Sequence, residues 1–171
     1  TASDKHLEIL TTKYKINFSE TFTTEESIYQ SVSLPYFIPE LREGIIEFDL
    51  VRNGLSSLIE EKDLKGILHN HSTYSDGNDT LKDMAIYCKE LGYEYLGICD
   101  HSKSAFYANG MKEDRIILQH QEIEKLNKEL APFKIFKGIE SDILSSGELD
   151  YSEDVLKSFD FIVASVHSNL R

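Results

Sequence analysis

The hydrophobic pattern changes near Leu64, and beyond that residue strand-like and helix-like segments alternate regularly. Short apolar runs bounded by turn residues predict strands at 64–71, 93–101, 133–143 and 160–168. Apolar residues at helical spacing predict helices at 79–92, 112–130 and 151–159. Asp79 or Thr80 would cap the first of these helices, Gly92 would end it, and residues 145–150 are predicted to turn within a small hairpin. Because strands that alternate with helices through short loops form βαβ units, the sequence predicts an α/β fold with about four parallel strands.

The segment at 1–62 lacks this alternation and is predicted to be a small appendage of helical and irregular structure. Residues 25–32 have the pattern of a short helix, and the two prolines within 34–41 interrupt regular structure. We therefore divide the chain into this appendage and an α/β domain at 63–171. His6 lies in the irregular appendage and is predicted to be on its surface.

Composition narrows the possible partners of the chain. Its 171 residues include 18 basic and 30 acidic side chains, and the net charge of −12 argues against binding nucleic acid through diffuse basic charge. An enzyme that meets phosphates through metal ions stays possible, because each divalent ion inverts the local field. Two cysteines without a disulfide framework favour a reducing cytoplasm. The sequence shows no signal peptide and no apolar run long enough to cross a membrane. Both ends are abrupt, so we expect the chain to be part of a longer protein.

Side chains of the kinds that bind metals follow each of the four predicted strands. In chain order they are His69, His71, Asp76, Asp100, His101, Glu140 with Asp142 beyond it, and His167. Because the carboxyl ends of parallel strands open on the same face, these residues are expected to converge there. His69 and His71 are two positions apart on one strand and are expected to point to the same side. Each motif is weak by itself, so the prediction of a metal site depends on all of them lying at one face.

Imidazole and carboxylate groups at one face suit Mn²⁺, Zn²⁺ or Fe²⁺, and there are more of them than one tetrahedral ion needs. We therefore predict a cluster of two or three divalent ions. Such clusters suit the hydrolysis of phosphate esters, because the ions lower the pKa of water and stabilise the attacking and leaving oxygens. Lys103, two residues after His101, is a candidate contact for a substrate phosphate. Elsewhere, His120 is predicted to be solvated, and Cys88 and Cys99 are predicted to be small buried apolar residues.

Four segments of the α/β region resemble, in order, the successive motifs of PHP (polymerase and histidinol phosphatase) domains: HNHSTYSDG, ICDHSKS with the following ANG, KGIESDIL and VASVHS. The likeness is greatest to the PHP domain fused to bacterial family X DNA polymerases. In the appendage, SLPYFIPELREG resembles the connector before that domain, and TASDKHLEIL through IYQSV is similar to the end of the polymerase thumb. The resemblance implies part of a distorted, TIM-like β/α barrel of seven strands with a trinuclear metal site.

Position by position, the resemblance implies metal ligands at His69, His71, Asp76, His101, Glu140 and His167. Catalysis is expected to depend on Glu140, His69, His71 and His101. Glu140 matches the carboxylate that bridges two ions, and Asp100, which precedes a ligand, is expected to orient an imidazole. The later ligands of the family, a histidine or cysteine and a final Asp-x-His, have no counterpart before Arg171. Since four strands cannot close a barrel, the missing half of the barrel or self-association of the chain is expected to complete it.

The resemblance implies a metal-dependent phosphoesterase, in particular a 3′–5′ exonuclease that acts on DNA 3′ ends during repair. Mn²⁺ is the favoured cofactor, with Zn²⁺, Fe²⁺ or Mg²⁺ as other candidates. One alternative is a histidinol-phosphatase-like phosphomonoesterase, against which the thumb-like appendage argues. Another is an inactive or partner-binding fragment with a partial metal site. Amidohydrolases, which hydrolyse C–N bonds, share the H-x-H pair, but the sequence has no candidate at a strand end for their metal-bridging lysine. The aspartates of the polymerase palm are also absent, so this chain alone is not expected to polymerise nucleotides.

Overall fold

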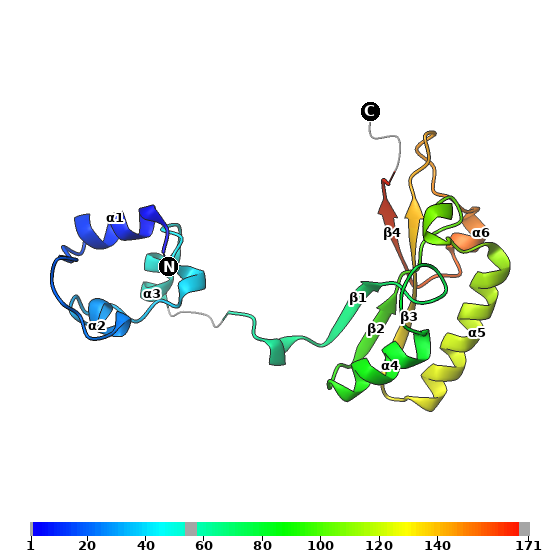
Figure 1. Ribbon diagram of the computed structural model, residues 1–171, viewed down its shortest axis with the longest axis horizontal. Coiled ribbons are helices and arrows are strands. Elements are labelled where there is room, and N and C mark those ends of the chain that lie inside the picture. Colours follow the sequence, from blue (N-terminus) through cyan, green and yellow to red (C-terminus); the bar gives the residue numbers. More distant parts are fainter. Residues whose placement is uncertain (1, 54–57, 168–171) are drawn as a thin grey trace. The chain divides into compact units, whose positions relative to one another are not determined.

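The computed structural model of the chain describes residues 2–53 and 58–167 (Figure 1). The chain divides into two compact units, Thr1–Leu58 and Ile59–Arg171. The second unit contains the β-sheet and the predicted metal ligands, whereas the described part of the first consists of helices and loops. Every helix within the described residues is too short or too polar to cross a membrane.

The second unit is built on four parallel strands that have the same order in the sheet as in the chain. They are β1 (Gly66–Asn70), β2 (Tyr95–Ile98), β3 (Lys134–Asp142) and β4 (Phe161–Ser165). The predicted α/β fold is confirmed, because these strands form a curled half-barrel with helices beside it (Figure 1). Their carboxyl ends therefore open on one side of the sheet.

Helices connect successive strands at the places that the sequence predicts. They are α4 (Leu81–Glu90), α5 (Glu113–Glu129) and α6 (Glu153–Leu156), with the short 3₁₀ helices η2 (Glu61–Asp63) before β1 and η3 (Phe106–Ala108) before α5. Thr80 caps α4 by accepting a hydrogen bond from the backbone N–H of Asp83, and Gly92 follows the helix with a φ of +85°. The predicted hairpin is also present, since Ile143 and Leu149 form an antiparallel bridge.

The sheet and its helices enclose an apolar cluster that holds the strands in place. Its buried members include Leu81, Ala85, Cys88, Leu96, Ile98, Ile123, Leu126 and Ile135. A fully buried Leu or Ile contributes about 1.5–3 kcal/mol relative to an exposed one, so this cluster fixes the strand ends beside which the polar residues lie. Cys99 is fully buried as well, so the prediction for both cysteines is confirmed.

β1 departs from a regular strand at the position of its histidine. Between Ile67 and Asn70 it contains one residue more than β2 does in the matching stretch, which makes a β-bulge. His69 lies in this bulge with a φ of +64°, a left-handed backbone conformation that is uncommon for residues other than glycine. Bulges and strained backbone of this kind re-aim side chains and occur often at functional sites. The direction of His69 therefore depends on the bulge and not on strand alternation alone.

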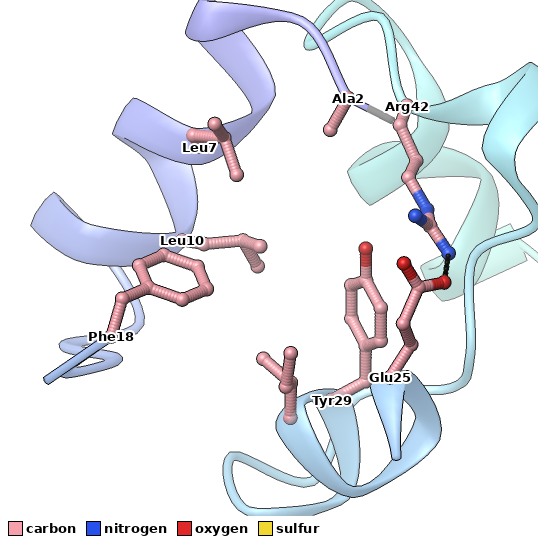
Figure 2. Close-up of a pocket in the computed structure, with 8 residues that line it drawn as sticks. Ala2, Leu7, Leu10, Phe18, Glu25, Tyr29 and Arg42 are labelled. Atoms are coloured by element: carbon pink, nitrogen blue, oxygen red, sulfur yellow. Dashed lines mark hydrogen bonds and ion pairs between the residues drawn. The ribbon is translucent and has the colours of Figure 1, made fainter. Parts of the chain in front are cut away.

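The first unit has an apolar core of its own. Its elements are α1 (Asp4–Thr12), α2 (Glu25–Gln30), η1 (Pro39–Leu41) and α3 (Glu47–Asn53), of which the sequence predicted α2. The core residues are Leu10, Ile16, Tyr29, Leu34, Phe37 and Phe48. A groove with a volume of about 290 Å³ lies beside this core, and the side chains of Arg42 and Glu25 meet at it (Figure 2). Nη2 of Arg42 lies 2.8 Å from Oε2 of Glu25.

His6 is buried in this core, so the prediction that it lies on the surface is wrong. Its Nδ1 is 2.7 Å from Oε1 of Glu47, its Nε2 is 3.1 Å from the hydroxyl of Tyr29, and none of its surface is exposed. The ring also stacks on Phe48 with the ring centres 5.0 Å apart. The partner carboxylate lies 41 residues away in the chain, and for that reason local sequence gave no sign of the pair.

Candidate metal centre

The six predicted ligands come together at the carboxyl ends of the strands. His69 and Glu140 belong to strands β1 and β3, whereas the other four follow strands in connecting segments: His71, Asp76, His101 and His167. The parallel sheet places these segments side by side, as expected from the strand order. The convergence is thus a property of the fold, and the role of each side chain as a metal ligand stays a prediction.

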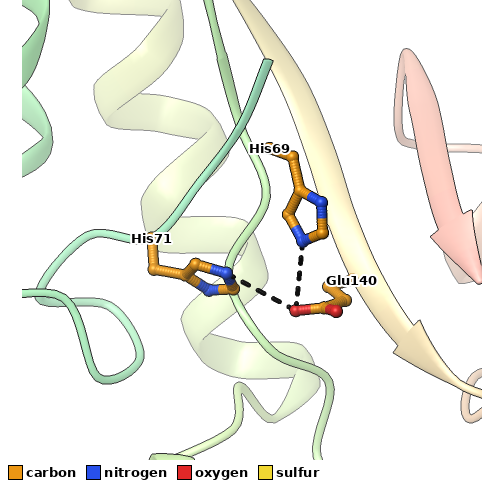
Figure 3. A group of neighbouring side chains, drawn as sticks. All are labelled: His69, His71 and Glu140. Carbon is orange, nitrogen blue, oxygen red and sulfur yellow. Dashed lines mark ion pairs between the residues drawn. The ribbon is translucent and has the colours of Figure 1, made fainter. Parts of the chain in front are cut away.

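Glu140 lies at the centre of the group, and the side chain of each nearby histidine approaches one of its oxygens. Oε2 is 3.3 Å from Nε2 of His69 and 3.4 Å from Nε2 of His71 (Figure 3). Oε2 is also 3.2 Å from Nδ1 of His101, and Oε1 is 3.1 Å from Nε2 of His167. Burial alone would raise the pKa of Glu140, but hydrogen bonding to His69 and the nearby imidazoles lowers it below its usual value. Glu140 is therefore a buried carboxylate that is charged at neutral pH.

Three overlapping groups of side chains each offer three ligand atoms within 4.8 Å of one another. They are His69–His71–Glu140, His71–Asp76–His101 and His101–Glu140–His167. Each group combines two imidazole nitrogens with one carboxylate oxygen, a donor set that suits Zn²⁺, Mn²⁺ and Fe²⁺. Any two groups share one residue, so ions held by them would be close neighbours.

Two ring nitrogens within these groups are buried without a hydrogen bond, namely Nδ1 of His71 and Nδ1 of His101. Nδ1 of His101 lies 3.2 Å from Oε2 of Glu140 but makes no hydrogen bond with it. A buried polar atom without a hydrogen bond is costly, and a metal ion would satisfy it. Burial and the neighbouring His101 lower the pKa of His71, so that its ring is neutral at neutral pH. Because neutral imidazole is the form that binds metal, the side chains present fit a cluster of divalent ions.

Asp142 has a specific contact that the sequence did not reveal. Its Oδ1 lies 2.6 Å from Nδ1 of His167, while the other ring nitrogen of His167 faces Glu140. The hydrogen bond to Asp142 raises the pKa of His167, and burial opposes this rise. A carboxylate on the far nitrogen of a histidine fixes its tautomer and orientation. The spacing of Glu140 and Asp142, two positions apart on one strand, was the available signal, because such residues share a face.

Asp100 anchors a loop, whereas the sequence led us to expect that it would orient an imidazole. Its carboxylate accepts hydrogen bonds from the backbone N–H and hydroxyl of Ser72 at 2.7 Å each, and from the hydroxyl of Ser75 at 2.5 Å. A fourth bond comes from Nε2 of Gln119 at 2.6 Å. Asp100 is fully buried, and its hydrogen bonds from Ser72 and Ser75 hold the loop that leads from His71 to the next predicted ligand. Asp100 therefore acts on the site through this loop and also through its charge, which favours the protonated form of His71.

Lys103 does not point freely toward the cluster. Its Nζ is 2.7 Å from Oε1 of Glu113 and lies 5.1 Å from the ring centre of Tyr151. A contact between Lys103 and a substrate phosphate would require this ion pair to open. His120, predicted to be solvated, is half-buried instead: its ring packs edge-on against Phe159 with centres 4.9 Å apart, and Nε2 is buried without a hydrogen bond.

Comparison with known proteins agrees with the motifs. The family model of the PHP domain matches residues 68–171, a range that contains all six converging side chains. The chain is also 43% identical over 150 residues to the DNA polymerase/3'-5' exonuclease PolX of Bacillus subtilis (strain 168). This alignment covers 88% of the chain and 26% of the relative, so the chain spans about a quarter of the length of that protein.

Proposed function

The chain belongs to the PHP domain family, and from this we propose that it forms part of a metal-dependent phosphoesterase that removes nucleotides from the 3′ end of DNA. Residues 63–171 would contribute to the phosphoesterase domain, and residues 1–62 would form the segment that joins it to the preceding part of a family X polymerase. In such a protein the exonuclease would act during repair synthesis. The relative bears the name of a 3'-5' exonuclease and aligns with most of this chain, which supports the choice of substrate.

One observation in particular carries the proposal, namely the position of Glu140 among four imidazoles. Its two oxygens lie 3.1 to 3.4 Å from ring nitrogens of His69, His71, His101 and His167. One histidine would be enough to balance the buried charge of this carboxylate. Stability of the fold therefore does not explain why four imidazoles surround it. A carboxylate that binds two neighbouring ions needs further ligand atoms beside both of its oxygens. In Glu140, imidazole nitrogens lie beside both oxygens.

The roles of the side chains follow from this arrangement. Bound divalent ions, for which we propose Mn²⁺, would lower the pKa of water and stabilise the attacking and leaving oxygens of a phosphoester. Glu140, His71 and His101 each belong to two of the three groups and would hold neighbouring ions together. His69 and His167 would complete the outer groups. Attack by water needs no side-chain nucleophile, so these residues act by holding the ions and the substrate in place.

The proposal is tested with a single-stranded oligonucleotide labelled at its 3′ end, incubated with the protein and Mn²⁺. We expect stepwise release of nucleotides from the 3′ end, and a loss of more than about 100-fold in rate for His69→Ala, since even partners of metal ligands cost 10–100-fold. His120→Ala is the matched control, because His120 belongs to none of the three ligand groups. It should retain the rate.

Two results would contradict the proposal. Hydrolysis of small phosphomonoesters without hydrolysis of DNA would indicate a phosphatase instead. Failure of the protein to bind Mn²⁺, Zn²⁺ or Fe²⁺ at millimolar concentration would indicate a partner-binding module that lacks the cluster. Metal analysis of the purified protein before the assay separates these two outcomes.

A further inference from the structure

A groove with a volume of about 420 Å³ adjoins the candidate metal centre. Phe106 and Tyr107 of η3 line one part of it, and the start of the hairpin, 143–146, lines another. Asp142 also lines the groove, and the same carboxylate lies 2.6 Å from Nδ1 of His167. The groove therefore begins where the group of predicted ligands ends.

The two aromatic rings in this groove are unusually exposed. Phe106 is 86% exposed, the highest value for any large apolar side chain among the described residues, and Tyr107 is 62% exposed. The rings meet edge to face with centres 6.1 Å apart. The Tyr107 ring also lies 6.4 Å from the His101 ring and 6.3 Å from the His167 ring. Exposed aromatic surface beside a polar site is typical of a surface that contacts a ligand.

The charges around the groove limit the ways in which it could bind a ligand. Its lining residues include the carboxylate of Asp142 and no basic side chain. Lys103 precedes the groove residue Ser104, and its Nζ is 2.7 Å from Oε1 of Glu113. Among the residues that the structure describes, no lysine or arginine lines the groove to hold a nucleic acid strand there. Stacking on aromatic rings provides an uncharged alternative, and it accepts any base because every base has a π-face.

We propose that Phe106 and Tyr107 form a stacking subsite for the unpaired terminal base of a single DNA strand whose phosphodiester lies at the metal centre. This inference rests on the proposed function and adds the element that distinguishes a nucleotide from a small phosphate ester. Binding is then divided between two chemistries: the metal-ligand cluster holds the phosphate, and the aromatic pair holds the base. The division explains how an acidic chain, with a net charge of −12, could bind DNA at all.

A fluorescence experiment tests the stacking without relying on hydrolysis. The chain contains no tryptophan, so Tyr107→Trp introduces a single indole reporter in the groove. Single-stranded oligo(dT) with a hydrolysis-resistant terminal linkage is titrated in at constant Mn²⁺. We expect quenching of the indole fluorescence in this variant. Tyr87→Trp is the matched control, since Tyr87 on α4 is also 62% exposed but lies outside the groove, and its signal should not change. Equal quenching of both variants, or of neither, would overturn the inference.

A kinetic experiment separates the base contact from the chemistry. With a single strand that ends in a normal nucleotide, Phe106→Ala/Tyr107→Ala should raise KM by about tenfold, the scale of one lost base–aromatic stack. With a strand that ends in an abasic nucleotide, wild type and double variant should have the same KM, and Phe106→Trp/Tyr107→Trp should restore normal binding of the first strand. An equal loss on both strands would show that the rings support the fold or face another part of the protein, and would refute the stacking subsite. If wild type releases no nucleotides, the proposed function fails, while the fluorescence titration of the Tyr107→Trp variant still decides the stacking.

Discussion

Asp142 and His167 form a short pair, with Oδ1 of Asp142 lying 2.6 Å from Nδ1 of His167. The pair leaves Nε2 of His167 directed at Glu140, 3.1 Å from its Oε1. The aspartate is nearly buried, with 8% of its side chain exposed, so its charge acts on the ring with little screening by water. This carboxylate thus sets both the tautomer and the direction of one predicted ligand.

Asp142→Asn should weaken metal binding by about 10- to 100-fold, the usual effect of removing a carboxylate from the far nitrogen of a metal-binding histidine. It should also lower the pKa of His167, because the contact with Asp142 is the main cause of its raised value. Calorimetric titration with Zn²⁺ measures the first effect, and NMR titration of the ring in metal-free protein measures the second. Ser104→Ala is the control, since Ser104 donates to Oδ2 of Asp142 at 2.8 Å without touching His167. If Asp142→Asn binds metal as tightly as wild type, Asp142 has no positioning role.

The three ligand groups make a graded prediction for histidine substitutions. His101 belongs to two groups and His69 to one. His101→Ala should therefore reduce the number of bound ions more than His69→Ala does, as measured by metal analysis after dialysis against a limiting chelator. Equal losses for the two variants would mean that the ions bind as a single cooperative unit. No loss for either would remove these residues from the ligand set.

The sequence predicted that these side chains converge, because their convergence depends on topology. Parallel strands in chain order bring their carboxyl ends together, so residues separated by 71 positions, such as His69 and Glu140, could be placed side by side from strand assignments alone. Strand assignments could not reveal the bulge at His69, which depends on the register with a neighbouring strand. They also could not reveal that Asp142 pairs with His167, because strand assignments do not fix the direction of a side chain that follows a strand, as His167 does.

The first unit shows the opposite case, in which the sequence predicted little. Its helices are short, and its core depends on contacts between segments without a shared period. The pairing of His6 with Glu47 joins positions that no local pattern relates. A histidine among polar neighbours is usually solvated, whereas His6 lies on the buried face of α1, where a carboxylate and a phenol bind it inside the core.

Glu47→Ala should destabilise the first unit by about 2–3 kcal/mol, because a buried hydrogen-bond donor that loses its acceptor costs about 1–3 kcal/mol. Glu47 accepts hydrogen bonds from His6 and from the backbone N–H groups of Gly44 and Ile45, and all three donors would lose their partner. Urea unfolding followed by circular dichroism measures the change. Glu8→Gln on the exposed side of α1 is the control and should stay within about 0.5 kcal/mol of wild type.

The same carboxylate predicts how the stability of the first unit depends on pH. Burial would raise the pKa of Glu47, but its hydrogen bonds outweigh burial and lower the pKa below 4.5. At Glu47 the unfolded chain therefore binds a proton more readily than the folded chain does. The stabilisation is fully present above pH 4.5 and is lost as the pH falls through the pKa of Glu47 in the folded chain. In Glu47→Gln this acid-dependent part of the loss should disappear. An unchanged acid profile would assign the pH dependence to other carboxylates.

Gly77→Ala should disturb the metal centre through the backbone. A Cβ at Gly77 would overlap with the carbonyl oxygen of His71, because the loop after β1 folds back closely over that residue. The Gly77 N–H donates to the carbonyl of Ser72 at 3.0 Å, which fixes this close approach. The loop also positions Asp76, so the variant should disturb the ligand group that contains Asp76 and lower metal affinity by about tenfold. Relief of the overlap should cost about 1–3 kcal/mol of stability. Zn²⁺ titration and urea unfolding measure the two effects, with the exposed neighbour Asn78→Ala as control. Wild-type affinity in Gly77→Ala would show that the loop can shift without moving His71 or Asp76, and that the close approach is not needed for the site.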